Sequence, residues 1–152
     1  MDENYDNYLI LDKFNVPRET FLELDEFKEL ILVKSKEINL ISPKTINNLK
    51  NRHIIDCAQA VDLIDINSKI CTDIGSGAGL PGIVLSIILK GKKIAMKMNL
   101  YEKSYHKSSF LRSFSKKLKL DSEIFQEDIF KKKNLVSGSI LVRAFKPLPV
   151  MT

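Results

Sequence analysis

The 152-residue chain is poor in side chains that bind metals or form cross-links, with two cysteines and two histidines. Cys57 and Cys71 are far apart in the sequence and form no Cys-x-x-Cys motif. We therefore expect reduced, structural thiols rather than a disulfide or a redox pair. With only His53 and His106 besides, no metal-ligand spacing is present, and no metal site is predicted.

Long apolar runs and targeting signals are also absent. The longest apolar run, residues 83–89, is interrupted by Ser86 and is far too short to span a bilayer. The first six residues are acidic and lack the basic and apolar regions of a secretory signal. A cytoplasmic protein with no membrane segment is the default expectation. At 44% hydrophobic content, 152 residues can bury one core but hardly two, which predicts a single domain over 1–152.

The most informative segment that is present runs from Asp73 to Gly82 and reads Asp-Ile-Gly-Ser-Gly-Ala-Gly-Leu-Pro-Gly. It places an acid and four glycines between an apolar strand and a helix that begins near Pro81. Glycine has no Cβ and tolerates a positive φ, so a ligand can approach the main chain and meet unpaired N–H groups at the helix start. This turn is the first candidate for a cofactor site.

Several nucleotide-binding motifs compete for the turn. A P-loop is excluded, because Ile83 and Val84 follow Gly82 where the motif needs lysine and serine or threonine. A dinucleotide fingerprint can be traced through Gly77, Gly79 and Gly82, so a nicotinamide-dependent oxidoreductase stays open as a less favoured alternative.

Two acids favour S-adenosylmethionine over a dinucleotide. Asp73 would lie at the carboxyl end of a strand, where a pyrophosphate is repelled and the ammonium and sulfonium groups of a methyl donor are attracted. Glu102 follows Gly82 by 20 residues, at the end of an alternating stretch that predicts a strand. An acid at the tip of the second strand commonly accepts hydrogen bonds from ribose hydroxyls.

The remaining periodicity predicts a helical region over 1–66 and alternating strands and helices over 67–152. Expected helices cover 18–38 and 45–64 in the first region and 81–89 and 105–118 in the second, and expected strands cover 69–74, 94–101, 123–125 and 139–144. Strand–helix alternation with short connections indicates an α/β fold with a mostly parallel sheet.

Five blocks of this sequence, in order, resemble the bacterial small-subunit ribosomal RNA guanine-N7 methyltransferases, the RsmG or GidB family. The blocks are residues 39–42, 52–57, 73–82, 110–112 and 143–148. The resemblance implies a Rossmann-like class I methyltransferase sheet, in the strand order three, two, one, four, with an N-terminal helical extension. It also implies S-adenosylmethionine as the cofactor and ribosomal RNA or the small ribosomal subunit as the partner.

The resemblance further implies which residues form the site. Cofactor contacts are expected from Asp73, Gly75, Gly77, Leu80, Glu102, Ile129, Phe130 and Arg143. Arg143 is the residue expected at the active-site mouth. No catalytic triad is expected, because guanine N7 has a free lone pair and orientation of the two substrates can suffice.

Family members continue beyond the position of Thr152, so the C-terminal strands of the sheet are expected to be missing here. The fourth strand would then be an exposed edge. A truncated, non-catalytic remnant that keeps the cofactor loop and a basic, RNA-facing surface is therefore an alternative function. The chain end itself is compatible with a short gene product, a clipped protein or an incomplete sequence.

Charge is unevenly distributed along the chain. Residues 1–30 hold nine acids and three bases, whereas residues 90–120 hold ten bases and a single acid, Glu102. A basic surface of this kind attracts a phosphate backbone. Its expected position beside the cofactor loop favours RNA as the partner, with a solubilising lysine-rich face as the alternative.

Overall fold

A computed structural model of the chain describes residues 15–42, 46–47, 49–128 and 138–142. Within them, four strands form one sheet in the order β3-β2-β1-β4, and every neighbouring pair is parallel. The strands are β1 (Ile70–Ile74), β2 (Lys97–Tyr101), β3 (Ser122–Phe125) and β4 (Ser139–Val142). The predicted strand order is confirmed, and β4 lies at one edge of the described sheet.

The helices are close to the predicted ranges, with one exception. They are α2 (Arg18–Lys34), α4 (Ile55–Gln59), α5 (Gly82–Gly91) and α6 (Tyr105–Lys117). The single helix expected over 45–64 is instead a π-helix η2 (Leu49–Ile54), the short α4 and a 3₁₀ helix η3 (Ala60–Leu63). The wider π turn relates residues five apart, so Leu49 and Ile54 can both face the core, where each is buried.

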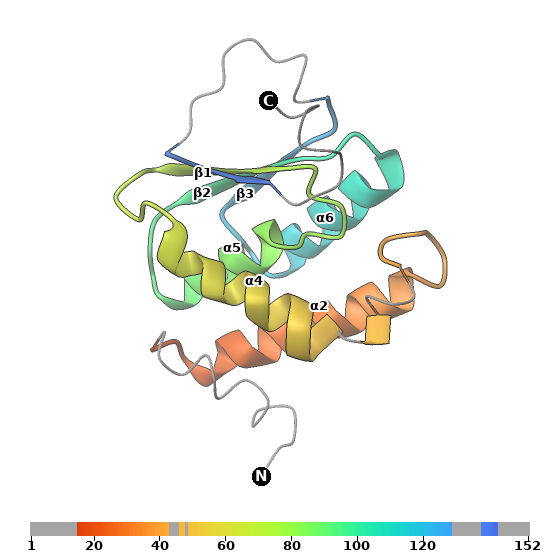
Figure 1. Cartoon of the computed structure of the whole chain (residues 1–152), viewed down its shortest axis with the longest axis horizontal. Coiled ribbons are helices and arrows are strands. Elements are labelled where there is room, and N and C mark those ends of the chain that lie inside the picture. The colour runs from red at the N-terminus through yellow and green to blue at the C-terminus, as the bar shows by residue number, and fades with distance from the viewer. Residues whose placement is uncertain (1–14, 43–45, 48, 129–137, 143–152) are drawn as a thin grey trace.

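Helix α5 is apolar on all sides because it is covered on all sides. Its residues from Gly82 to Leu89 are all buried. Figure 1 shows α5 and α6 lying against one face of the sheet, with α2 and α4 forming a further layer beyond them. A helix that is hydrophobic all round is a core helix, and α5 holds this place between the sheet and the N-terminal helices. No helix in the described ranges is both long and apolar enough to cross a membrane.

The N-terminal helix α2 joins this core through its aromatic residues. Phe21, Leu24, Phe27 and Ile31 recur at helical spacing and are buried, as the sequence predicts. The ring of Phe27 packs against that of Phe114 on α6, with centroids 5.0 Å apart. Aromatic packing therefore fastens the helical region to the strand–helix units.

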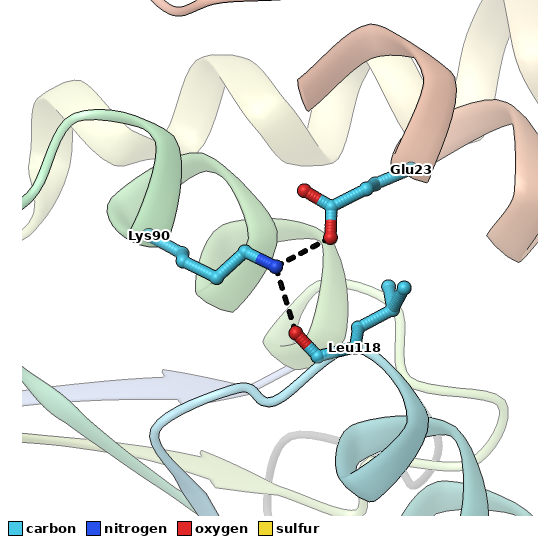
Figure 2. A network of polar contacts seen from close by, with 3 residues as sticks. All are labelled: Glu23, Lys90 and Leu118. Atoms are coloured by element: carbon cyan, nitrogen blue, oxygen red, sulfur yellow. Dashed lines mark hydrogen bonds and ion pairs between the residues drawn. The ribbon is translucent and has the colours of Figure 1, made fainter. Parts of the chain in front are cut away.

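A polar contact connects the C-terminal ends of α5 and α6 with α2. The Lys90 Nζ, on the last turn of α5, donates to the main-chain oxygen of Leu118 at 2.7 Å and to a carboxylate oxygen of Glu23 on α2 (Figure 2). Leu118 is the C-cap of α6, and a cation there satisfies a terminal carbonyl and complements the helix dipole. Lys90 thus connects α2, α5 and α6.

Replacing Lys90 with methionine, which keeps most of the aliphatic stem, should lower the free energy of unfolding by about 1 kcal/mol, because a half-exposed ion pair and a capping bond are both lost. Urea unfolding of Lys90→Met measures this, with Lys69→Met at an exposed lysine before β1 as the control. Equal stability of the two variants would contradict a tethering role for Lys90.

Candidate functional site

The glycine-rich turn connects the carboxyl end of β1 to the start of α5, as the sequence predicts. Asp73 is 1% exposed, and its Oδ2 accepts a hydrogen bond from the Gly82 N–H at 3.0 Å. Gly82 is the first residue of α5, so the carboxylate also lies at the positive end of that helix. This contact fixes both ends of the turn.

Gly82 leaves room for this contact. A Cβ at Gly82 would lie 2.8 Å from Leu100 Cδ2 on β2 and still closer to the carboxylate of Asp73. Only a residue without a side chain allows the helix to begin so near the sheet. The glycine at this position therefore serves close packing.

The backbone N–H groups of the turn are mostly directed at the protein. Gly75 and Ser76 donate to the main-chain oxygen of Tyr101 at 2.9 and 3.0 Å, and Gly77 donates to Glu102 Oε2 at 3.0 Å. The Gly79 N–H donates to the main-chain oxygen of Ser76 at 2.7 Å. At the helix start the N–H groups of Gly82 and Ile83 are likewise paired, with Asp73 and with the main-chain oxygen of Gly79, so the expectation of unpaired N–H groups is wrong at these positions.

Glu102 is held against the turn from the tip of β2. It is 9% exposed, and its Oε1 accepts from the Ser104 N–H at 3.3 Å while its Oε2 accepts from Gly77. Ser104 in turn caps α6 by accepting from the Lys107 N–H. The two candidate segments, far apart in the sequence, are thereby in direct contact.

The other predicted site residues are only partly described. Gly75 and Gly77 have positive φ values of 68° and 55°, and Leu80 is a core residue, 6% exposed. Ile129, Phe130 and Arg143 lie outside the described residues. Their roles stay predictions.

One feature of this edge was not anticipated from the sequence. The Tyr101 ring, directly before Glu102, stacks on Phe125 at the end of β3, with centroids 4.7 Å apart and planes at 13°. An aromatic residue at the end of each of two adjacent parallel strands was the available signal, because register pairs Tyr101 with Phe125.

The basic residues of 90–120 divide between the two ends of the sheet. Lys103 and Lys107 flank the start of α6, beside Glu102. Most of the others follow or end α5 and α6, which return to the amino end of the strands: Lys90, Lys92, Lys93, Lys116, Lys117 and Lys119. The basic residues of 90–120 were expected to lie beside the cofactor loop, and only some of them, such as Lys103 and Lys107, do so. No group of histidines, cysteines and acids that could hold a metal occurs among the residues described.

The fold has a counterpart among solved structures. A protein described as a protein-L-isoaspartate O-methyltransferase from Plasmodium falciparum, in complex with S-adenosyl-L-homocysteine, superimposes with a TM-score of 0.51. The match covers 88% of this chain and 66% of that one, at 16% identity. The chain therefore has the Rossmann-like fold of the class I methyltransferases, as predicted.

Sequence comparison identifies the family. The family model for rRNA small subunit methyltransferase G matches residues 21–152. A ribosomal RNA small subunit methyltransferase G of Pelagibacter ubique is 50% identical over 99% of this chain, and those of Bartonella tribocorum and Rickettsia rickettsii are each 40% identical over 88%. The chain belongs to this methyltransferase family, which confirms the predicted cofactor class, S-adenosylmethionine. It spans 72% of the Pelagibacter relative and 63% and 66% of the other two.

Alanine substitutions at two glycines of the turn should have different effects. In Gly82→Ala the new methyl group meets the Asp73 carboxylate and Leu100, so unfolding should become easier by about 3 kcal/mol. In Gly77→Ala the Cβ meets only the Gly75 main-chain oxygen at 4.0 Å, so the cost should be about 1 kcal/mol, from the positive φ alone. Chemical denaturation compares the two, and equal losses would contradict the packing role of Gly82.

The buried thiol next to the site predicts a pH dependence. Burial, and secondarily the charge of Asp73, raise the pKa of Cys71 from 9.0 to about 11. The unfolded chain therefore loses this proton first, so the stability contribution is complete below about pH 9 and is lost as pH rises towards 11. Urea midpoints from pH 8 to 11 should fall more steeply for the wild type than for Cys71→Ala. Parallel curves would contradict the assignment.

Proposed function

We propose that this chain binds S-adenosylmethionine at the carboxyl ends of β1 and β2 and methylates N7 of a guanine in small-subunit ribosomal RNA. The family match over residues 21–152 supports the reaction class. The proposed location of the cofactor site is supported by the hydrogen bond between Gly77 and Glu102, in which a nearly buried carboxylate lies beside a turn of small residues. A carboxylate at this position suits the ribose hydroxyls of the cofactor.

Each predicted residue has a proposed role at this edge. Glu102 binds the ribose, Gly75 and Gly77 let the cofactor approach the backbone, and the segment at Leu80 lies beside it. Ile129 and Phe130 are proposed to contact the adenine, and Arg143 to stand at the mouth of the site. For Asp73 the hydrogen bond to Gly82 supports a positioning role, in which the carboxylate holds the turn in shape for the cofactor.

The nicotinamide alternative finds little support in this geometry. A pyrophosphate needs N–H donors directed outward from the helix start. Here the N–H groups of Gly75, Ser76 and Gly77 are directed at Tyr101 and Glu102, and that of Gly82 at Asp73. Two acids in contact with the turn also repel phosphate.

The proposed reaction asks little of the chain beyond binding and orientation. When bound, S-adenosylmethionine supplies an electrophilic methyl group on a sulfonium centre. Guanine N7 carries a lone pair and no proton, so no general base is needed. Holding the guanine and the methyl donor in line accounts for the acceleration of the reaction. The rigid β1–α5 turn, fixed by Asp73 and Glu102, provides that alignment on the cofactor side.

The proposed partner is ribosomal RNA or the small ribosomal subunit, and the proposed location is the cytoplasm, where such a substrate is found. Lys103 and Lys107, beside Glu102, are placed to attract RNA phosphates near the reaction centre.

The test combines binding and transfer. Calorimetry should show that the wild-type chain binds S-adenosylmethionine and its demethylated product but not NAD. Glu102→Gln should weaken that binding about tenfold, because a charge-assisted hydrogen bond to the ribose becomes a neutral one. Tritium from labelled cofactor should appear as N7-methylguanine in small subunits that lack the modification.

Glu123→Gln is the matched control, because Glu123 is exposed on β3 and pairs with Lys97 away from the turn. Its cofactor affinity should equal that of the wild type. Cofactor binding without transfer would favour the non-catalytic remnant. A folded chain that binds NAD and ignores the methyl donor would overturn the proposal.

A further inference from the structure

Helices α5 and α6 end in the same way. Both ends lie near the amino ends of the strands, whereas the proposed cofactor site is at the carboxyl ends. Each has a C-cap in helical conformation followed by a lysine with positive φ, 58° at Lys93 and 55° at Lys119. Each turn is closed by two backbone hydrogen bonds: Lys93 to Lys90 and Ile94 to Leu89 in α5, and Lys119 to Lys116 and Leu120 to Ser115 in α6. Both are complete Schellman motifs.

Lysine is an unfavourable residue at this position. The residue after the C-cap of a Schellman motif is usually glycine, because the left-handed conformation brings the Cβ of other residues too close to the following carbonyl. The helix dipole does not require these lysines, since the last turns already contain Lys90, Lys116 and Lys117. Fold stability therefore does not explain why both positions carry lysine.

The two turns lie side by side and share one cavity of about 240 Å³, lined by Lys90, Lys93, Lys119 and Asp121 among others. Figure 2 shows that Lys90 is engaged with Glu23 and the Leu118 carbonyl. Lys93 and Lys119 are exposed and make no ion pair with any described residue. Asp121 is the acid that faces this cavity, so the two lysines together outweigh it.

We propose that Lys93 and Lys119, here called the C-cap lysine pair, bind phosphates of the RNA substrate at a second contact distant from the reaction centre. This inference rests on the proposed function. The ten residues of α5 extend about 15 Å, so the pair lies that far from the glycine turn and contacts a different part of the RNA. An ammonium on a flexible stem suits a backbone phosphate as a point charge and reads no base sequence.

The positive φ at both positions allows a test in which charge and stability change in opposite directions. Lys93→Gly/Lys119→Gly removes both charges and relieves the backbone, so its melting temperature should rise by about 2–4 °C or more. Lys93→Gln/Lys119→Gln removes the charges and keeps the backbone strain, and Lys93→Arg/Lys119→Arg keeps the charges. All three should bind S-adenosylmethionine like the wild type, since the pair lies away from the turn.

Binding to small-subunit ribosomal RNA is then measured across a series of salt concentrations. The Gly and Gln variants should bind about tenfold more weakly in low salt, and the slope of log affinity against log salt should fall by about 2, one for each lost phosphate contact. The Arg variant should keep the wild-type slope. Lys36→Gln, at an exposed lysine after α2, is the control and should leave the slope unchanged.

If the wild-type chain binds RNA and the Gly and Gln variants have the same slope of log affinity against log salt as the wild type, this inference alone is overturned. Loss of affinity in the Gly variant without a change in slope would also overturn it, because phosphate contact would not be the cause. A wild-type chain that binds S-adenosylmethionine but no RNA at any salt concentration would overturn both this inference and the RNA part of the proposed function.

Discussion

The candidate site depends on the hydrogen bond between the Asp73 carboxylate and the Gly82 N–H. It joins the end of β1 to the first turn of the buried helix α5, and this restricts the path of the eight residues between them. A buried carboxylate is costly unless it is hydrogen-bonded, and the helix start supplies both a donor and a favourable field. The absence of a side chain at Gly82 is the steric condition for this contact.

Residues at the end of β2 accept the hydrogen bonds that the N–H groups of the turn donate. Tyr101 offers its main-chain oxygen and Glu102 its side chain, so the turn is held from β2 as well as from β1. In this arrangement the N–H groups of Gly75, Ser76, Gly77 and Gly82 all have acceptors within the protein, and two acids contact the turn. We propose that such a turn disfavours phosphate and suits a cationic, phosphate-free cofactor, which agrees with membership of a methyltransferase family.

The approximate ranges of α2, α5 and α6 could be predicted from apolar periodicity, and a parallel sheet from strand–helix alternation. The strand order followed from the family resemblance, and the expectation that the glycine turn and Glu102 share one site followed from the place of an acid at the tip of the second strand. The hydrogen bonds of the turn could not be predicted, since the partners of Gly75 and Gly77 come from a strand whose register the sequence does not specify. The π turn at Leu49 could not be predicted, because Ile54, Ala58 and Val61, which follow it, recur at the spacing of an ordinary helix. A Cβ at Gly138 would overlap the Ser68 side chain, a constraint visible only in three dimensions.

The complete enclosure of α5 has a consequence for how the chain acquires its structure. A helix with no polar side cannot be left in water, so the strand–helix units need the earlier helices as a lid and the earlier helices need α5 as a base. We therefore expect the N-terminal helices and the strand–helix units to fold together, because α5 is shielded from water only when both are in place.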